Sequence, residues 1–132
     1  MKPLIFFSLF LIFACSSNQA NYSKAENAFD AGREFIDGIL KGDFKKSAHF
    51  MLMDTSNQQF LNVHEKEFRI KDKEGRQQLR TASIIIQQIE DVDSTTSLIH
   101  YHNSFDKINH TLKVVKQNNS WTVDFKYSFQ NK

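Results

Sequence analysis

Three histidines are the first residues whose type and spacing could do chemistry. His100 and His102 form an H-x-H pair, and His110 follows on the next predicted strand. Imidazole rings on one face of neighbouring strands could hold a transition metal. One loop length places His100 opposite His110, whereas a loop one residue different turns Ile99 and Tyr101 inward and the H-x-H pair outward. Hydrophobicity favours the second arrangement, and no carboxylate or Cys lies beside the histidines, so we expect no metal site.

His110 has a second candidate role, as a general base. The alternation of the last two predicted strands places it on their apolar face, opposite Tyr127. Such a pair could serve as the acid and base of an enzyme. However, Asp124 falls on the other face, so no carboxylate is expected to orient the ring. Catalysis by His110 and Tyr127 is therefore the alternative hypothesis, and a core or cavity-rim histidine is the simpler one.

The same apolar face predicts a candidate pocket lining. Small-molecule sites are mostly apolar and aromatic, with a few polar groups. The candidates are Leu112, Trp121, Phe125, Tyr127 and Phe129. Packing of this stripe against a helix is the competing explanation, and the sequence leaves both open.

Cys15 is the only cysteine of the chain. It ends a short N-terminal segment in which Lys2 is followed by an apolar run. A basic start, an apolar stretch and a small residue are typical of a secretory signal peptide. The run is shorter than the roughly 20 residues that cross a bilayer. A lone thiol forms no disulfide within the chain, so the fold must depend on an ordinary hydrophobic core.

The residues around the cysteine resemble a bacterial lipobox, with Ile12, Phe13 and Ala14 before Cys15. The resemblance implies cleavage after Ala14 and a diacylglyceryl group on Cys15, with a further acyl chain on its amine. Two or more acyl chains anchor a protein stably to a membrane. Ser16 does not resemble an inner-membrane retention signal, so the outer membrane, facing the periplasm, is the expected location.

The chain is therefore expected to contain one domain behind an anchor. Residues 1–14 form the signal peptide, residues 15–23 the lipidated cysteine and a polar tether, and residues 24–132 the domain. The 17 basic and 15 acidic residues nearly balance, which argues against a nucleic-acid-binding protein. No cofactor is expected.

The first half of the domain predicts helices. Apolar residues at 3–4 spacing predict a helix over 24–41, with Ser23 as its cap and Glu26 completing a capping box. Further helices are expected over 44–53, after Asp43, and from Ser56 to Phe68. The segment RIKDKEGRQQ is expected to form a charged loop or a short hairpin.

The second half, from Thr81 onward, predicts strands. Asn118-Asn119 suits a two-residue hairpin turn because Asn tolerates positive φ. This turn predicts the pairs Gln117–Ser120, Val114–Val123, Leu112–Phe125, His110–Tyr127 and Ile108–Phe129, with Lys113 opposite Asp124. Helices followed by an antiparallel sheet with one apolar face make an α+β fold.

The order of these elements resembles a nuclear transport factor 2-like domain, in particular the small exported bacterial families of the DUF4878 type. The stretches FIDGILKGDFKKSAHFM, TTSLIHYHNSF and LKVVKQNNSWTVDF carry the resemblance. It implies N-terminal helices packed on a curled antiparallel sheet of about four strands, enclosing a cone-shaped cavity. It implies no particular activity, because one fold hosts many functions.

The leading hypothesis is thus a non-catalytic envelope lipoprotein that binds a protein partner or a small apolar ligand. The alternative is a small-molecule enzyme of isomerase or dehydratase type that uses His110 and Tyr127. A third hypothesis is an assembly module, with a weak homodimer formed through the polar outer face of the sheet.

Overall fold

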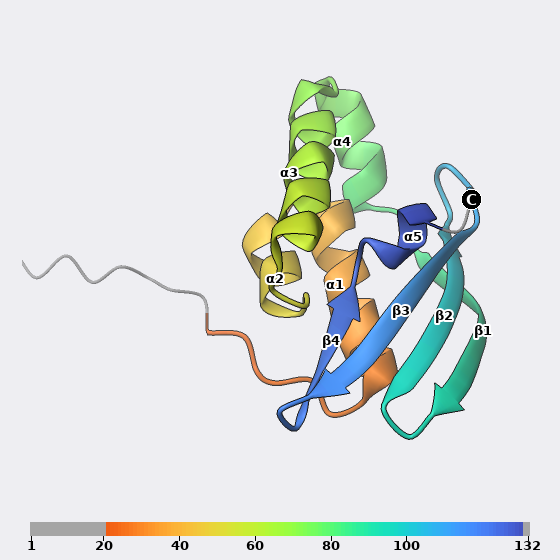
Figure 1. Ribbon diagram of the computed structural model, residues 1–132. Coiled ribbons are helices and arrows are strands. Elements are labelled where there is room, and N and C mark those ends of the chain that lie inside the picture. Colours follow the sequence, from red (N-terminus) through yellow and green to blue (C-terminus); the bar gives the residue numbers. More distant parts are fainter. Residues whose placement is uncertain (1–20, 131–132) are drawn as a thin grey trace, which may run out of the picture.

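The structure is a computed structural model that describes residues 21–130. Helices come first, an antiparallel sheet follows, and a short helix ends the described chain (Figure 1). The helices are α1 (Ala28–Lys41), α2 (Phe44–His49), α3 (Thr55–Ile70), α4 (Lys73–Arg80) and α5 (Tyr127–Gln130). The strands are β1 (Ile84–Asp93), β2 (Thr96–Asn103), β3 (His110–Gln117) and β4 (Ser120–Asp124). The expected α+β class is confirmed.

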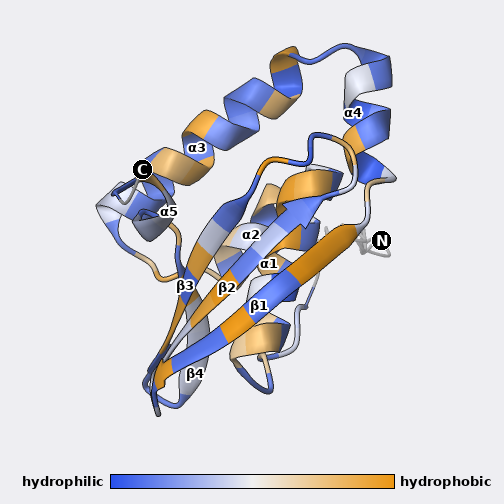
Figure 2. Cartoon of the chain, turned by 90° about the vertical axis from the view of Figure 1, so that its right-hand side faces the viewer, coloured by the Kyte–Doolittle hydropathy of each residue, from blue (hydrophilic) through white to orange (hydrophobic). Residues whose placement is uncertain are grey.

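The four strands lie in the order β1-β2-β3-β4, all antiparallel, and the sheet is not closed. α1 packs on all four of them and lies behind the sheet in Figure 2. The core between them contains Phe35 and Ile36 of α1 and Ile99, Leu112 and Val114 of the sheet, all at most 1% exposed. This layout is consistent with a helix-wrapped curled sheet.

α1 begins later than its periodicity predicts. The side chain of Asn27 accepts a hydrogen bond from the Asp30 N–H at 2.9 Å and caps the helix, so neither Ser23 nor Glu26 does so. The helix ends at Gly42, whose φ of 74° is left-handed, as expected. Within the helix, a Cβ at Gly32 would collide with Ile99, so glycine lets α1 approach the sheet closely.

The predicted second helix, over 44–53, is too long. α2 ends at His49 because the following residues pair with β4. Val123 donates its N–H to the Phe50 carbonyl and accepts from Leu52 N–H, both at 2.8 Å. Met51, expected on the helix, forms a parallel bridge with Val123 instead.

Tyr22 belongs to the packed domain, although its position suggests part of a tether. Its hydroxyl donates to Asp43 Oδ2 at 2.8 Å, and its ring lies 5.5 Å from that of His49. This hydrogen bond raises the pKa of the Tyr22 hydroxyl, because it favours the protonated form. The chain is therefore held against α2 before α1 begins.

The third helix is confirmed, but its cap is Asp54, whose Oδ1 accepts from Asn57 N–H at 2.8 Å. The expectation of a loop or hairpin over RIKDKEGRQQ is wrong, because α4 forms there. Asp72 caps α4 through Gly75 N–H at 2.7 Å, and the Arg80 guanidinium lies 5.5 Å from the centre of the Phe68 ring. Hydrophobic periodicity does not predict α4, because Leu79 is its only large apolar residue.

The β3–β4 hairpin has the expected register over its first residues. Gln117 pairs with Ser120, Val114 with Val123 and Lys113 with Asp124. Both turn residues have positive φ, 49° for Asn118 and 58° for Asn119.

Beyond Asp124 the predicted strand is wrong, and the Leu112–Phe125, His110–Tyr127 and Ile108–Phe129 ladder pairs do not form. The chain leaves the sheet after Asp124, because Oδ1 of Asn57 on α3 accepts a hydrogen bond from Lys126 N–H at 2.7 Å. α5 then follows, and Ser128 Oγ donates to the Thr111 carbonyl at 2.7 Å.

Candidate ligand cavity

A cavity of about 500 Å³ lies between the helices and the sheet. α1, α3, the end of α4, the β2–β3 loop and α5 contribute to it. Its apolar walls include Ile36, Ile39, Leu40, Phe68, Phe125 and Phe129. The size and the apolar character are those of a small-molecule site.

Tyr101 and Asn103 bring two hydrogen-bond donors from β2 into this apolar lining. Burial, followed by the charge of Asp106, raises the pKa of the Tyr101 hydroxyl well above its usual range. The hydroxyl therefore stays protonated. Among residues 21–130 it has no hydrogen-bond partner, whereas its ring stacks on His110 with centroids 5.2 Å apart.

The side chain of Asn103 has a fixed orientation. Its Oδ1 accepts from the backbone N–H groups of Phe105 and Asp106, both at 3.0 Å. The NH₂ group is then the free part of the amide, since no acceptor for it is present in the described chain. Asn103 is only 4% exposed, so the cavity is where this donor can find a partner.

His64 contributes an acceptor from α3. Its Nδ1 lies 3.0 Å from the Phe60 carbonyl, which can only accept, so Nδ1 carries the proton. In the neutral ring Nε2 is then a lone-pair acceptor. The ring packs edge-on against Phe125 and Phe129, at 5.0 and 5.5 Å between centroids.

Charged and exposed apolar residues also line the cavity. Glu67, Lys71 and Asp106 supply two negative charges and one positive charge. Phe105 and Ile108, on the β2–β3 loop, are 44% and 56% exposed although both line the cavity. An apolar ligand would meet these two side chains on entering.

The residues predicted to line a pocket divide into two groups. Phe125 and Phe129 line the cavity, whereas Leu112, Trp121 and Tyr127 do not. His110, predicted as a possible general base, also lines it. Leu112 is buried opposite Ile99 in the core. Trp121 and Tyr127 each have a lysine ammonium 5.6 Å from the ring centre, from Lys116 and Lys113 respectively.

The structure decides which way the histidine pair faces. Ile99 pairs with Leu112 and Tyr101 with His110 on the inner face, so His100 and His102 lie on the outer face, as hydrophobicity favours. His100 Nδ1 lies 2.9 Å from Thr111 Oγ1. Within residues 21–130, no group of three or more His, Cys, Asp or Glu side chains could hold a metal ion.

Two polar atoms, His102 Nδ1 and Thr122 Oγ1, are buried without a partner in the part of the chain that the structure describes. Neither residue lines the cavity, whereas the donors of Tyr101 and Asn103 are open to it.

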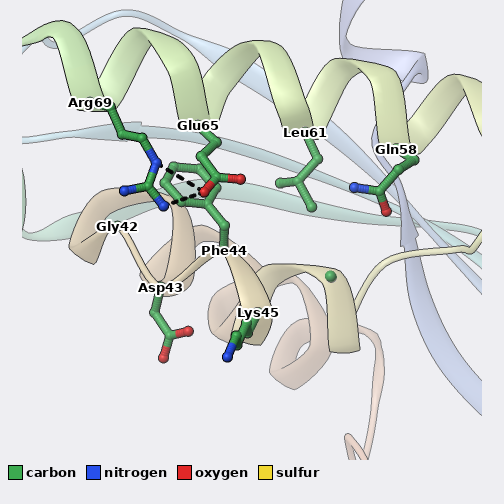
Figure 3. A pocket seen from close by; sticks show the side chains of 9 residues that line it. Gly42, Asp43, Phe44, Lys45, Gln58, Leu61, Glu65 and Arg69 are labelled. Atoms are coloured by element: carbon green, nitrogen blue, oxygen red, sulfur yellow. Dashed lines mark hydrogen bonds and ion pairs between the residues drawn. The ribbon is translucent and has the colours of Figure 1, made fainter.

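A second hollow, of about 450 Å³, lies between α2 and α3 (Figure 3). Phe44 and Leu61 form its apolar part, and at one end Arg69 Nε donates to Glu65 Oε1 at 3.0 Å within α3. Asp43 and Lys45 point away from α3 in Figure 3, and Glu65 and Arg69 are already paired with each other. The cavity under the sheet is the better candidate site.

Sequence reasoning missed Tyr101 and Asn103 as residues that line the cavity. The available signal was their alternation with Ile99, which places all three on one face of β2 once Ile99 is inside. His64 was recognisable as part of an apolar stripe, without a role.

No family model, curated protein or solved structure matches the chain. No helix within residues 21–130 is long and apolar enough to cross a membrane. Cys15 and the signal segment lie outside the described residues.

Proposed function

We propose that this protein is a lipid-anchored envelope protein with a nuclear transport factor 2-like domain, and that the domain holds a small apolar ligand non-catalytically. The observation that carries the binding role is the apolar cavity of about 500 Å³ with polar groups at a few points. The lipobox-like residues before Cys15 support the anchor, and the α+β layout supports the family.

The position of Tyr22 bears on how the domain would hang from an anchor. The Tyr22 hydroxyl is hydrogen-bonded to Asp43, so residues 16–21 form the segment that connects Cys15 to the domain. Six residues span at most about 20 Å when fully extended. The domain would therefore stay close to the outer membrane, facing the periplasm.

Catalysis by a His110–Tyr127 pair is less well supported than binding. His110 lines the cavity, but Tyr127 begins α5 and is not among the lining residues. A non-catalytic role needs no such pair, because retention of a ligand requires only shape and a few polar contacts.

The anchor is tested by labelling cells with radioactive palmitate. We expect Cys15→Ser to lose the label and Ser16→Ala to keep it, because the acyl chains are attached at position 15. A Cys15→Ser protein that remains labelled, or membrane-bound after signal cleavage, would refute the anchor.

The binding role is tested on the full chain purified from the envelope, by mass spectrometry of the small molecules that accompany it. Leu79→Trp places a large side chain at the cavity from α4, whereas Gln78→Trp adds the same ring at the neighbouring exposed position. We expect Leu79→Trp to lose the accompanying molecule and Gln78→Trp to retain it. Equal retention in both variants would contradict binding in the cavity.

A further inference from the structure

The unpaired donors of the cavity indicate what kind of atom a ligand presents. A hydroxyl or an amide removed from water without a partner destabilises a fold, so buried polar groups are almost always hydrogen-bonded. Tyr101 and Asn103 both line the cavity, and neither the hydroxyl nor the NH₂ group has a partner within residues 21–130. Both groups are open to the cavity, so a ligand that displaces water from them must supply an acceptor.

The two donors are placed to act together. Tyr101 and Asn103 are successive residues of one face of β2, which puts their Cα atoms about 7 Å apart along the strand. A carbonyl oxygen has two lone pairs and can accept from both. Each donor is also held in place, Tyr101 by its stacking on His110 and Asn103 by its two bonds to the loop backbone.

The charge around the donors favours a neutral acceptor over a carboxylate. Asp106 lies close enough to help raise the pKa of Tyr101, so its negative charge acts at the hydroxyl. Glu67 adds a second negative charge to the lining, against the single positive charge of Lys71. An anionic group would be repelled there, whereas a ketone, ester or amide oxygen would not.

We propose that the cavity binds an apolar molecule carrying a neutral carbonyl oxygen, which accepts hydrogen bonds from the Tyr101 hydroxyl and the Asn103 amide. The proposal rests on the binding function proposed above. The apolar body of the ligand lies against Ile36, Ile39 and Phe125, and Phe105 and Ile108 form the apolar rim through which it enters.

The test uses three naphthalenes substituted at the same ring position. Acetylnaphthalene carries the carbonyl, isopropenylnaphthalene has the same shape with a CH₂ group in place of the oxygen, and naphthoate carries the charge. The full chain in phosphatidylcholine nanodiscs is titrated with each, and binding is followed by the amide NMR signals of the protein. Empty nanodiscs correct for probe dissolved in lipid.

We expect acetylnaphthalene to bind at least about fivefold more tightly than isopropenylnaphthalene, and naphthoate to bind most weakly. Tyr101→Phe keeps the ring and removes the hydroxyl, so it should reduce the preference for the ketone over the hydrocarbon about fivefold. Asn103→Asp keeps the acceptor for the loop and removes the NH₂ donor, so it should reduce the preference as well. Tyr22→Phe, whose hydroxyl lies outside the cavity, is the matched control.

The outcomes separate the two proposals. Equal binding of ketone and hydrocarbon, or a preference that survives Tyr101→Phe, overturns the carbonyl inference and leaves apolar binding intact. A preference unchanged by Asn103→Asp overturns the part assigned to Asn103. Binding of none of the three probes overturns both the inference and the binding function.

Discussion

Two groups of buried and half-buried polar side chains differ in how completely they are paired. One joins the start of α3 to the end of β4 around Asn57, and the other lines the cavity around Tyr101 and Asn103. Asn57 is completely buried, and both ends of its amide are used. The Tyr101 hydroxyl and the Asn103 NH₂ group have no partner in the described chain.

The Asn57 cluster consists of Asn57, Asp54, Asp124 and Lys126, which are joined to one another by hydrogen bonds and ion pairs. Asn57 Nδ2 lies 3.1 Å from each of three acceptors, the Leu52 carbonyl, Asp54 Oδ2 and Asp124 Oδ1. Lys126 completes it, with its ammonium 2.8 Å from Asp54 and 2.6 Å from Asp124. These bonds turn the chain out of the sheet after β4, and so they allow Phe125 and Phe129 to reach the cavity.

The comparison teaches that burial of a polar residue does not by itself identify a site. Saturated polar groups position the elements, whereas unpaired donors that also line a cavity indicate where a ligand can complete the bonding. Removing a saturated group should destabilise the fold, and removing an unsaturated one should mainly affect binding.

The largest effect is expected for Asn57→Ala. It removes four hydrogen bonds at a completely buried site and leaves their partners unsatisfied, so the free energy of unfolding should fall by about 3 kcal/mol. Urea unfolding measures it. Asn62→Ala, at an exposed position of the same helix, should change it by less than about 0.5 kcal/mol. Similar losses in both variants would contradict the structural role of the cluster.

An intermediate effect is expected for Lys126→Met, because Lys126 is partly exposed. Losing both ion pairs should lower the free energy of unfolding by about 1 kcal/mol at neutral pH.

The Lys126→Met variant should also change how the stability of the fold depends on acid pH. The Asn57 N–H, and then Lys126, hold the pKa of Asp54 below its usual range.

A lowered carboxyl pKa stabilises the folded state above the unfolded pKa, near 4, and this contribution is lost as the pH falls further. The stability of the parent protein should therefore decline as the pH falls below about 4, and that of Lys126→Met should decline less steeply. Urea unfolding at several pH values measures the slopes, and parallel slopes would show that Lys126 does not act on Asp54.

The smallest effect on stability is expected for Tyr101→Phe. Its hydroxyl has no partner among residues 21–130, so its removal should change the free energy of unfolding by less than about 0.5 kcal/mol. Ser47→Ala is the contrasting variant, because the buried Ser47 Oγ donates to the Phe35 carbonyl at 3.0 Å. It should lower the stability by about 1 kcal/mol. An equal loss in both would mean that the Tyr101 hydroxyl is bonded within the fold.

Local sequence signals were sufficient where the interactions themselves are local. The Asn118-Asn119 turn gave the correct register of β3 and β4, because a two-residue turn determines which residues face each other. Local signals failed where a residue distant in the sequence bonds to the backbone of a predicted strand. The strand that alternation predicts through Phe129 ends at Asp124, because Asn57 takes the N–H of Lys126.

The sequence by itself determined the order of the main helices and strands and the α+β class. Hydrophobic periodicity contains this information, because each face must be either buried or solvated. For β2, hydrophobicity favoured the face that carries Ile99 and Tyr101, and the structure decided it. The tertiary structure decided that Phe125, Phe129, Tyr101 and Asn103 share one cavity while Leu112, Trp121 and Tyr127 lie elsewhere. The physical reason is that only the packed fold shows which polar groups are already bonded and which remain open to a ligand.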